Sequence, residues 1–182
     1  LPYACTLATH GVQVVGVDIN PHVINTLRNG ALHIHEPGLG EVVSQALSSG
    51  RLTISQTLEP ADAFIIAVPT PFIEHEQGEY QGMLYRKADM TAVASATEAI
   101  LPHLRPGNLV ILESTSPPRT TVDLVAPILE RSGLRAGVDF HLAYSPERVL
   151  PGKILSELVE NAHVIGGVNA ASAQAGYDLY AI

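Results

Sequence analysis

Short apolar runs alternate along the whole chain with segments whose apolar residues recur at helical spacing, and this alternation predicts the fold. Runs with the composition of strands lie at 12–18, 51–55, 61–69, 108–115 and 138–146, with a short strand or turn at 163–167. Segments with the spacing and caps of helices lie at 2–10, 21–29, about 40–48, 89–101, 120–133 and 170–182. Strands that alternate with helices through short connections predict a doubly wound α/β fold with a parallel sheet.

Turn residues place several of the boundaries. Asn20 is a good N-cap, Pro21 suits the first helical position, and Gly30 ends that helix. Pro127 lies inside the predicted helix 120–133, so we expect a kink there. Residues 70–88 are polar and rich in Gly and Tyr, and we expect an irregular, mobile excursion near the site.

Three apolar runs end in the same way. The sequences are AFIIAVPTP (63–71), LVILESTSPP (109–118) and FHLAYSPERVLPG (140–152), and each breaks into Thr, Ser or Glu beside a proline. Proline cannot continue a β-ladder, so each strand must stop there. Ligands of open parallel α/β sheets bind outside the carboxyl ends of the strands. Any one ending could be a plain strand-to-loop turn, but the three together predict one site built from three loops.

Composition excludes several other kinds of function. The 182 residues carry a net charge of −8, which argues against a general nucleic-acid or anionic-membrane surface. No apolar run approaches the ~20 residues that span a bilayer. Cys5 is the only cysteine, so the chain can form neither an intrachain disulfide nor a cysteine metal cluster, which fits a reducing cytoplasm. His33 and His35, with Glu36 beside them, lie at a spacing that occurs in metal sites. No further ligand lies nearby in the sequence, and we predict no metal site.

Asp18 closes the predicted strand 12–18. An acid at such an end binds the adenosine ribose hydroxyls of a dinucleotide and favours NAD over NADP, although Asp at a strand end is also a common turn or cap residue. The glycine-rich turn that usually accompanies this acid lies about 20 residues upstream. No such turn is among the 17 residues before Asp18. We therefore expect the first strand and this turn to lie before Leu1, on roughly 15 further residues.

With these features in place, the chain resembles the UDP-glucose/GDP-mannose dehydrogenase family. The matching stretches are LPYACTLATHG (1–11), VVGVDIN (14–20), HEPGL (35–39), IIAVPTPF (65–72), LVILESTSPP (109–118), YSPERVLPGK (144–153) and VIGG (164–167). The resemblance implies a Rossmann-type NAD-binding domain over 1–168, followed at 169–182 by the start of a central connecting helix. It also implies oxidation of the C6 alcohol of a nucleotide sugar to a carboxylate, with two NAD and a covalent thiohemiacetal on cysteine.

Site residues follow from the resemblance position by position. Asp18 would bind the adenosine ribose, and Pro69 and Thr70 would contact the cofactor. Thr115 would lie near the nicotinamide and the reacting sugar, and Glu147 would sit between cofactor and substrate, which gives both residues a catalytic and a cofactor-binding role. Arg148 and Val149 would begin the loop along the UDP-sugar. Independently of the resemblance, Glu113 directly follows an apolar strand and is either catalytic or only an anchor that holds its loop by hydrogen bonds.

Departures from the family pattern narrow the substrate. UDP-glucose members commonly carry a second carboxylate where this chain has Pro151, so the run SPERVLPG favours UDP-N-acetylmannosamine over UDP-glucose or GDP-mannose. His163 stands where related sequences usually have Arg.

Further family residues are expected downstream of residue 182, among them the nucleophilic Cys and the basic Lys. Cys5 is expected in the core rather than as this nucleophile. We therefore expect the chain alone to have no dehydrogenase activity. The resemblance implies a homodimer for the full-length protein, and a non-catalytic nucleotide-binding module is the alternative from another class.

Overall fold

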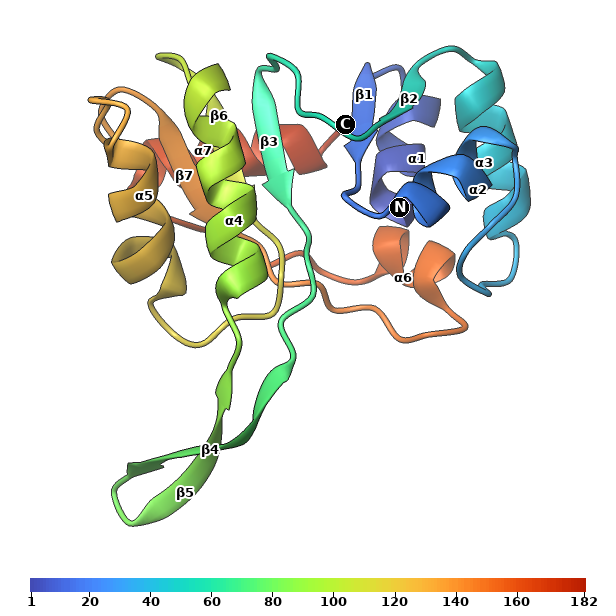
Figure 1. Cartoon of the computed structure of the whole chain (residues 1–182). Helices are drawn as coiled ribbons and strands as arrows, with labels where there is room; N and C mark the ends of the chain where they lie inside the picture. Colours follow the sequence, from blue (N-terminus) through green and yellow to red (C-terminus); the bar gives the residue numbers. More distant parts are fainter. The chain divides into compact units, whose positions relative to one another are not determined.

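The computed structural model describes every residue of the chain, 1–182, and divides it into two compact units. Unit 1 contains residues 1–59 and 148–163 together with Ile182, and unit 2 contains residues 60–147 and 164–181. Figure 1 shows the elements of both. Each unit has its own parallel β-ladder and is described by itself. None of the helices combines the length and the apolar character needed to cross a bilayer.

Unit 1 is a two-stranded parallel ladder with helices packed on it. Strands β1 (Val14–Val17) and β2 (Leu52–Ser55) pair from Val14 opposite Leu52 to Val17 opposite Ser55. The helices are α1 (Pro2–Thr9), α2 (Pro21–Arg28), α3 (Leu39–Ser48) and α6 (Ile154–Glu160). Helix α2 starts as the sequence predicts, because Pro21 is its first residue and the Asn20 side chain accepts the backbone N–H of His22 at 2.9 Å.

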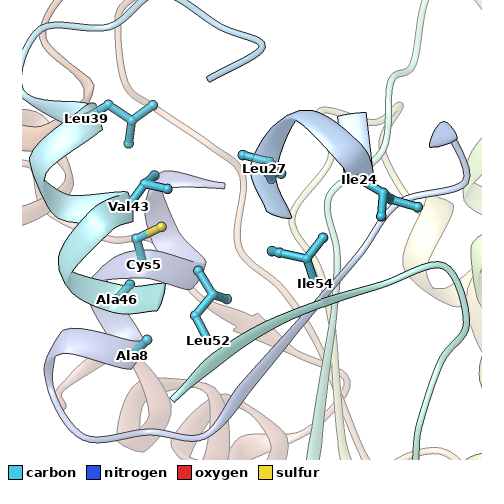
Figure 2. Packing of buried hydrophobic residues seen from close by; sticks show 9 residues of the cluster. All are labelled: Cys5, Ala8, Ile24, Leu27, Leu39, Val43, Ala46, Leu52 and Ile54. Atoms are coloured by element: carbon cyan, nitrogen blue, oxygen red, sulfur yellow. The ribbon is translucent and has the colours of Figure 1, made fainter. Parts of the chain in front are cut away.

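Small and branched apolar side chains build the core of unit 1. Figure 2 shows the cluster, which consists of Cys5, Ala8, Ile24, Leu27, Leu39, Val43, Ala46, Leu52 and Ile54. Full burial of one leucine or isoleucine side chain stabilises the fold by about 1.5–3 kcal/mol. Cys5 is 0% exposed, and burial raises the pKa of its thiol. The prediction that Cys5 is a core residue is therefore confirmed.

Unit 2 contains a four-stranded sheet in the order β3-β6-β7-β8. Strands β3 (Ala63–Ile66), β6 (Leu109–Leu112) and β7 (His141–Tyr144) are parallel, and β8 (Gly166–Gly167) pairs antiparallel with β7. Strand β6 lies between two neighbours and is buried at all four residues, as a parallel strand covered on both faces should be. Figure 1 shows α4 (Thr91–Ile100) and α5 (Ala126–Glu130) on one face of this sheet and α7 (Ala170–Tyr180) on the other.

The parallel ladder in each unit and the helices that connect the strands along the chain confirm the α/β prediction, while β8 makes the sheet of unit 2 mixed rather than purely parallel. Among the described strands, β1 pairs only with β2 and β3 pairs only with β6. The expected additional strand and its glycine-rich turn stay predictions.

Residues 70–88 are not irregular, so this prediction was wrong. They form an antiparallel hairpin of β4 (Phe72–Tyr80) and β5 (Met83–Ala88), which extends away from β3 and α4 (Figure 1). Gln81 and Gly82 connect the strands with φ of 51° and 79°, and two positive φ values are the mark of a tight hairpin turn. Gly78 leaves space for the ring of Tyr85, its partner across the strands.

Two further differences concern helices. Helix α6 was not predicted from the sequence. The predicted helix 120–133 is divided into a π-helical stretch, Thr121–Val125, and the short helix α5, in which Pro127 is the second residue. The expected helix is thus interrupted just before Pro127 by a wider, π-helical turn, and the kink itself stays a prediction.

Candidate functional site at the strand ends

Ser114 joins the segments that follow β3 and β6. Its hydroxyl accepts the backbone N–H of Val68 at 2.8 Å and donates to the carbonyl of Ile66 at 3.3 Å. The N–H groups of Glu113 and Ser114 also donate to the Ile66 carbonyl, at 2.9 and 3.1 Å. The buried Ser114 thus supplies the hydrogen bonds between the two segments after the β3–β6 ladder ends. These bonds hold together the two loops that begin beyond β3 and β6.

Thr70 and Thr115 meet directly beyond this point. The Thr70 hydroxyl donates to the backbone carbonyl of Thr115 at 2.7 Å. Thr70 is half-buried, whereas Pro69 and Thr115 are exposed. The structure therefore brings together two of the three endings predicted to form the site. It leaves the Thr115 side chain accessible to a ligand.

The segment that follows β7 is hydrogen-bonded to the segment that follows β6. The Ser145 N–H donates to the carbonyl of Leu112 at 3.0 Å, and the Glu147 N–H donates to the carbonyl of Glu113 at 3.3 Å. Glu147 is exposed. Pro69, Thr70, Thr115 and Glu147 thus all belong to one hydrogen-bonded group of loops at the carboxyl end of the unit 2 sheet.

Glu113 is the buried carboxyl of this group. Its residue is 8% exposed, and the Tyr180 hydroxyl of α7 donates to its Oε1 at 3.4 Å. Burial, and after it the negative charge of Glu147, raises the pKa of Glu113 from the ordinary 4.5 to about 7. A substantial share of Glu113 is therefore neutral near pH 7, and a neutral carboxyl can donate a hydrogen bond as well as accept one.

Asp18 lies in unit 1, at the end of β1. Its N–H extends the ladder to the carbonyl of Ser55 at 3.2 Å, and its Oδ1 accepts the N–H of Asn20 at 2.8 Å. Asp18 therefore stabilises the turn after β1, which is one of the two roles expected for an Asp at a strand end. The ribose-binding role stays a prediction.

Arg148 and Val149 also belong to unit 1, since the boundary between the units falls after Glu147. Arg148 is exposed and donates from Nη1 to the carbonyl of Ala162 at 3.2 Å, and Val149 is half-buried. The Asn161 amide donates in turn to the Arg148 carbonyl at 3.1 Å. The start of the predicted substrate loop is therefore folded against the segment that follows α6.

Two contributors were missed from the sequence. Ser114 lies between residues that were singled out, and its signal is a hydroxyl that remains buried after an apolar run ends. Tyr180 gives no signal of its own, because it reaches Glu113 across 67 residues of sequence.

The donors and acceptors present suit NAD. Asp18 offers a carboxylate at a strand end, which suits ribose hydroxyls. Arg28 of the following helix donates from Nε and Nη2 to the carbonyl of Ile54, at 3.0 and 2.7 Å. Since this guanidinium is already engaged, it is poorly placed to hold the 2′-phosphate that distinguishes NADP.

Parallel α/β ladders with polar and acidic residues at their carboxyl ends are typical of dinucleotide-binding domains. Comparison with known proteins gives the particular family: the chain matches the UDP-glucose/GDP-mannose dehydrogenase family, NAD binding domain, over residues 1–182. The chain belongs to this family.

Individual relatives agree with this assignment. The chain is 47% identical over 180 residues to the UDP-N-acetyl-D-mannosamine dehydrogenase of Methanococcus maripaludis (strain C7), covering 99% of the chain and 39% of that protein. It is 43% identical over 187 residues to the NDP-N-acetyl-D-galactosaminuronic acid dehydrogenase of Ralstonia solanacearum, covering 99% of the chain and 42% of the relative.

Among solved structures, the native UDP-N-acetyl-mannosamine dehydrogenase of Staphylococcus aureus superimposes with a TM-score of 0.91 at 48% identity, covering 99% of the chain and 42% of that protein. The chain thus spans only about two fifths of the length of the relatives it matches.

Proposed function

We propose that the full-length protein oxidises the C6 alcohol of UDP-N-acetyl-D-mannosamine to the carboxylate with NAD, and that this chain is its cofactor-binding part. The proposal depends above all on one observation, the hydrogen-bonded group of loops that holds Thr70, Thr115 and Glu147 at the carboxyl ends of β3, β6 and β7. The UDP-N-acetylmannosamine dehydrogenases of Methanococcus maripaludis and Staphylococcus aureus, which are 47% and 48% identical to the chain, support this substrate. Pro151, in place of a second carboxylate, also favours it over UDP-glucose.

The chain's own residues would orient the reactants and manage protons. Thr70 is bound to the Thr115 carbonyl, which holds the two loops that would flank the cofactor. The exposed Thr115 hydroxyl can donate to a water or to an oxygen that gains negative charge during the reaction. Glu147, which is exposed beside the buried Glu113, would lie between cofactor and sugar.

Bound NAD supplies the hydride acceptor for C6. Because alcohol-to-carboxylate oxidation removes four electrons and adds one water oxygen, each sugar requires two NAD, of which each accepts one hydride. The thiol and the basic Lys that the resemblance implies would come from the rest of the protein.

NADH absorbance of the full-length protein tests the proposal with UDP-N-acetylmannosamine, UDP-glucose and GDP-mannose in parallel. We expect two NADH per UDP-N-acetylmannosamine and no signal from the other two sugars. Oxidation of UDP-glucose or GDP-mannose instead would show that the protein acts on a different nucleotide sugar from the one proposed. NAD binding without turnover of any sugar would favour the alternative of a non-catalytic nucleotide-binding module.

The organisation of the whole protein is also a proposal. We assign residues 1–168 to a doubly wound NAD-binding domain whose remaining strand and glycine-rich turn belong to the full-length protein. In this assignment α7 is the start of a central connecting helix, and the full-length protein is a homodimer. A cytoplasmic location would fit the need for NAD and a UDP-sugar.

A further inference from the structure

Glu36 is a buried carboxylate that binds the backbone of a distant loop. The residue is 6% exposed and lies between α2 and α3. Its Oε2 accepts the N–H of Gly152 and its Oε1 accepts the N–H of Ile154, both at 2.8 Å. These donors lie 116 and 118 residues further along the chain. One side chain therefore connects the HEPGL and SPERVLPGK motifs.

The loop that Glu36 holds consists of residues 148–153, the start of the predicted substrate segment. Two further hydrogen bonds of this loop are made within the neighbouring segment: the N–H of Leu150 donates to Glu157 Oε2 at 2.8 Å, and the N–H of Lys153 donates to the carbonyl of Leu150 at 3.0 Å. These bonds shape the loop but do not attach it to the α2–α3 connection. Glu36 makes that attachment, with the charge of a carboxylate shared between two backbone donors.

Packing next to Glu36 reinforces the attachment. Gly38 has a φ of +77°, and a side chain there would lie 3.3 Å from Cδ1 of Leu155, so the two segments approach closely. Leu155 also packs against the apolar cluster of unit 1. Loss of the carboxylate would therefore leave two partly buried hydrogen bonds unmade while the surrounding apolar contacts remain, and the expected consequence is a looser loop in an otherwise folded unit.

We propose that Glu36 is a positioning residue for the UDP-sugar, which acts by fixing the 148–153 loop in the conformation that binds the substrate. It does not touch the substrate itself. The inference rests on the proposed function, because it takes Arg148 and Val149 as the start of the substrate-binding loop.

The test compares Glu36→Gln, Glu36→Asp and Glu36→Ala with the unchanged full-length protein. Glu41→Gln, an exposed glutamate on α3, is the matched control. Since a charge-assisted hydrogen bond commonly contributes a factor of ten or more, we expect the KM for UDP-N-acetylmannosamine to rise about tenfold in Glu36→Gln and further in Glu36→Ala. The KM for NAD should stay within about twofold, since the loop is not assigned to the cofactor.

Amide hydrogen exchange provides a readout that does not depend on turnover. The amides of Gly152 and Ile154 should exchange faster in Glu36→Gln, while those of the β1–β2 ladder stay unchanged. Glu36→Asp keeps both acceptor oxygens on a shorter side chain and should lie between wild type and Glu36→Gln, which keeps the comparison valid if Glu36→Ala does not fold.

Three results would overturn the inference: equal rises in both KM values, an unchanged sugar KM, or unchanged exchange at Gly152 and Ile154. If the wild-type protein binds no UDP-sugar although these two amides are protected, the proposed function fails first and the positioning role falls with it. If the wild type oxidises the sugar and Glu36→Gln behaves like Glu41→Gln, only the positioning role fails.

Discussion

Glu113 is the one carboxyl of the site that the fold buries, and replacing it with glutamine should change how stability depends on pH. In the folded protein its pKa is raised from the ordinary 4.5 to about 7, first by burial and then by the charge of Glu147. At about 1.4 kcal/mol per pH unit, this rise corresponds to about 3.5 kcal/mol, which we take as an upper limit. Glutamine has nearly the same shape and keeps an oxygen that can accept from Tyr180.

The sign follows from comparing the folded and unfolded states. Below pH 4.5 the carboxyl is protonated in both states and contributes no pH dependence. As the pH rises from about 4.5 to about 7, the unfolded state loses the proton before the folded state does, so ionisation favours unfolding. Above pH 7 the full destabilisation is present. Glu113→Gln removes this destabilisation.

Urea unfolding of wild type and Glu113→Gln at pH 5 and pH 8 measures the effect. Relative to wild type, the variant should gain stability between these two pH values, by at most about 3 kcal/mol. Glu59→Gln replaces an exposed glutamate and should leave the pH dependence unchanged. If Glu113→Gln and wild type lose stability in parallel from pH 5 to pH 8, Glu113 does not titrate near 7 and the argument from its burial is refuted.

Three other predictions concern packing and cofactor binding. Gly167→Ala should destabilise by about 1–3 kcal/mol or more in urea unfolding, because its Cβ would collide with the backbone of Ala173, whereas Gly166→Ala has open space and should be nearly neutral. Leu39→Ala, at 0% exposure, should cost about 2–5 kcal/mol in the same assay. Leu84→Ala, at 70% exposure in the hairpin, should stay within about 0.5 kcal/mol, and equal losses at both leucines would contradict the assigned core. Asp18→Ala should weaken NAD binding by roughly tenfold or more in calorimetry of the full-length protein, and an unchanged affinity would remove the ribose-binding role.

The hairpin of β4 and β5 could not be predicted from local sequence patterns. The strands of the segment 72–88 are mostly exposed, and neither shows the alternation of apolar and polar residues that marks a half-buried strand. Its turn is Gln-Gly rather than Asn-Gly or Asp-Gly, the usual signals for this geometry. Helix α6 was missed because it has only seven residues and its N-cap, Lys153, makes no side-chain capping hydrogen bond, so the usual start signal of a helix is absent.

The sequence by itself determined where the strands end and which residues follow them. Apolar runs, prolines and caps act over a few neighbouring residues, so β3, β6 and β7 and the start of α2 were predictable. That the three strand ends lie near one another was expected from the general rule for parallel sheets. The tertiary structure decided which of the polar groups are buried and what they bind. Glu36 finds Gly152 and Ile154, and Glu113 finds Tyr180, across 67 to 118 residues of sequence. Such partners depend on how whole elements pack, and burial then changes the hydrogen bonding of Glu36 and the pKa of Glu113 in ways that no local pattern encodes.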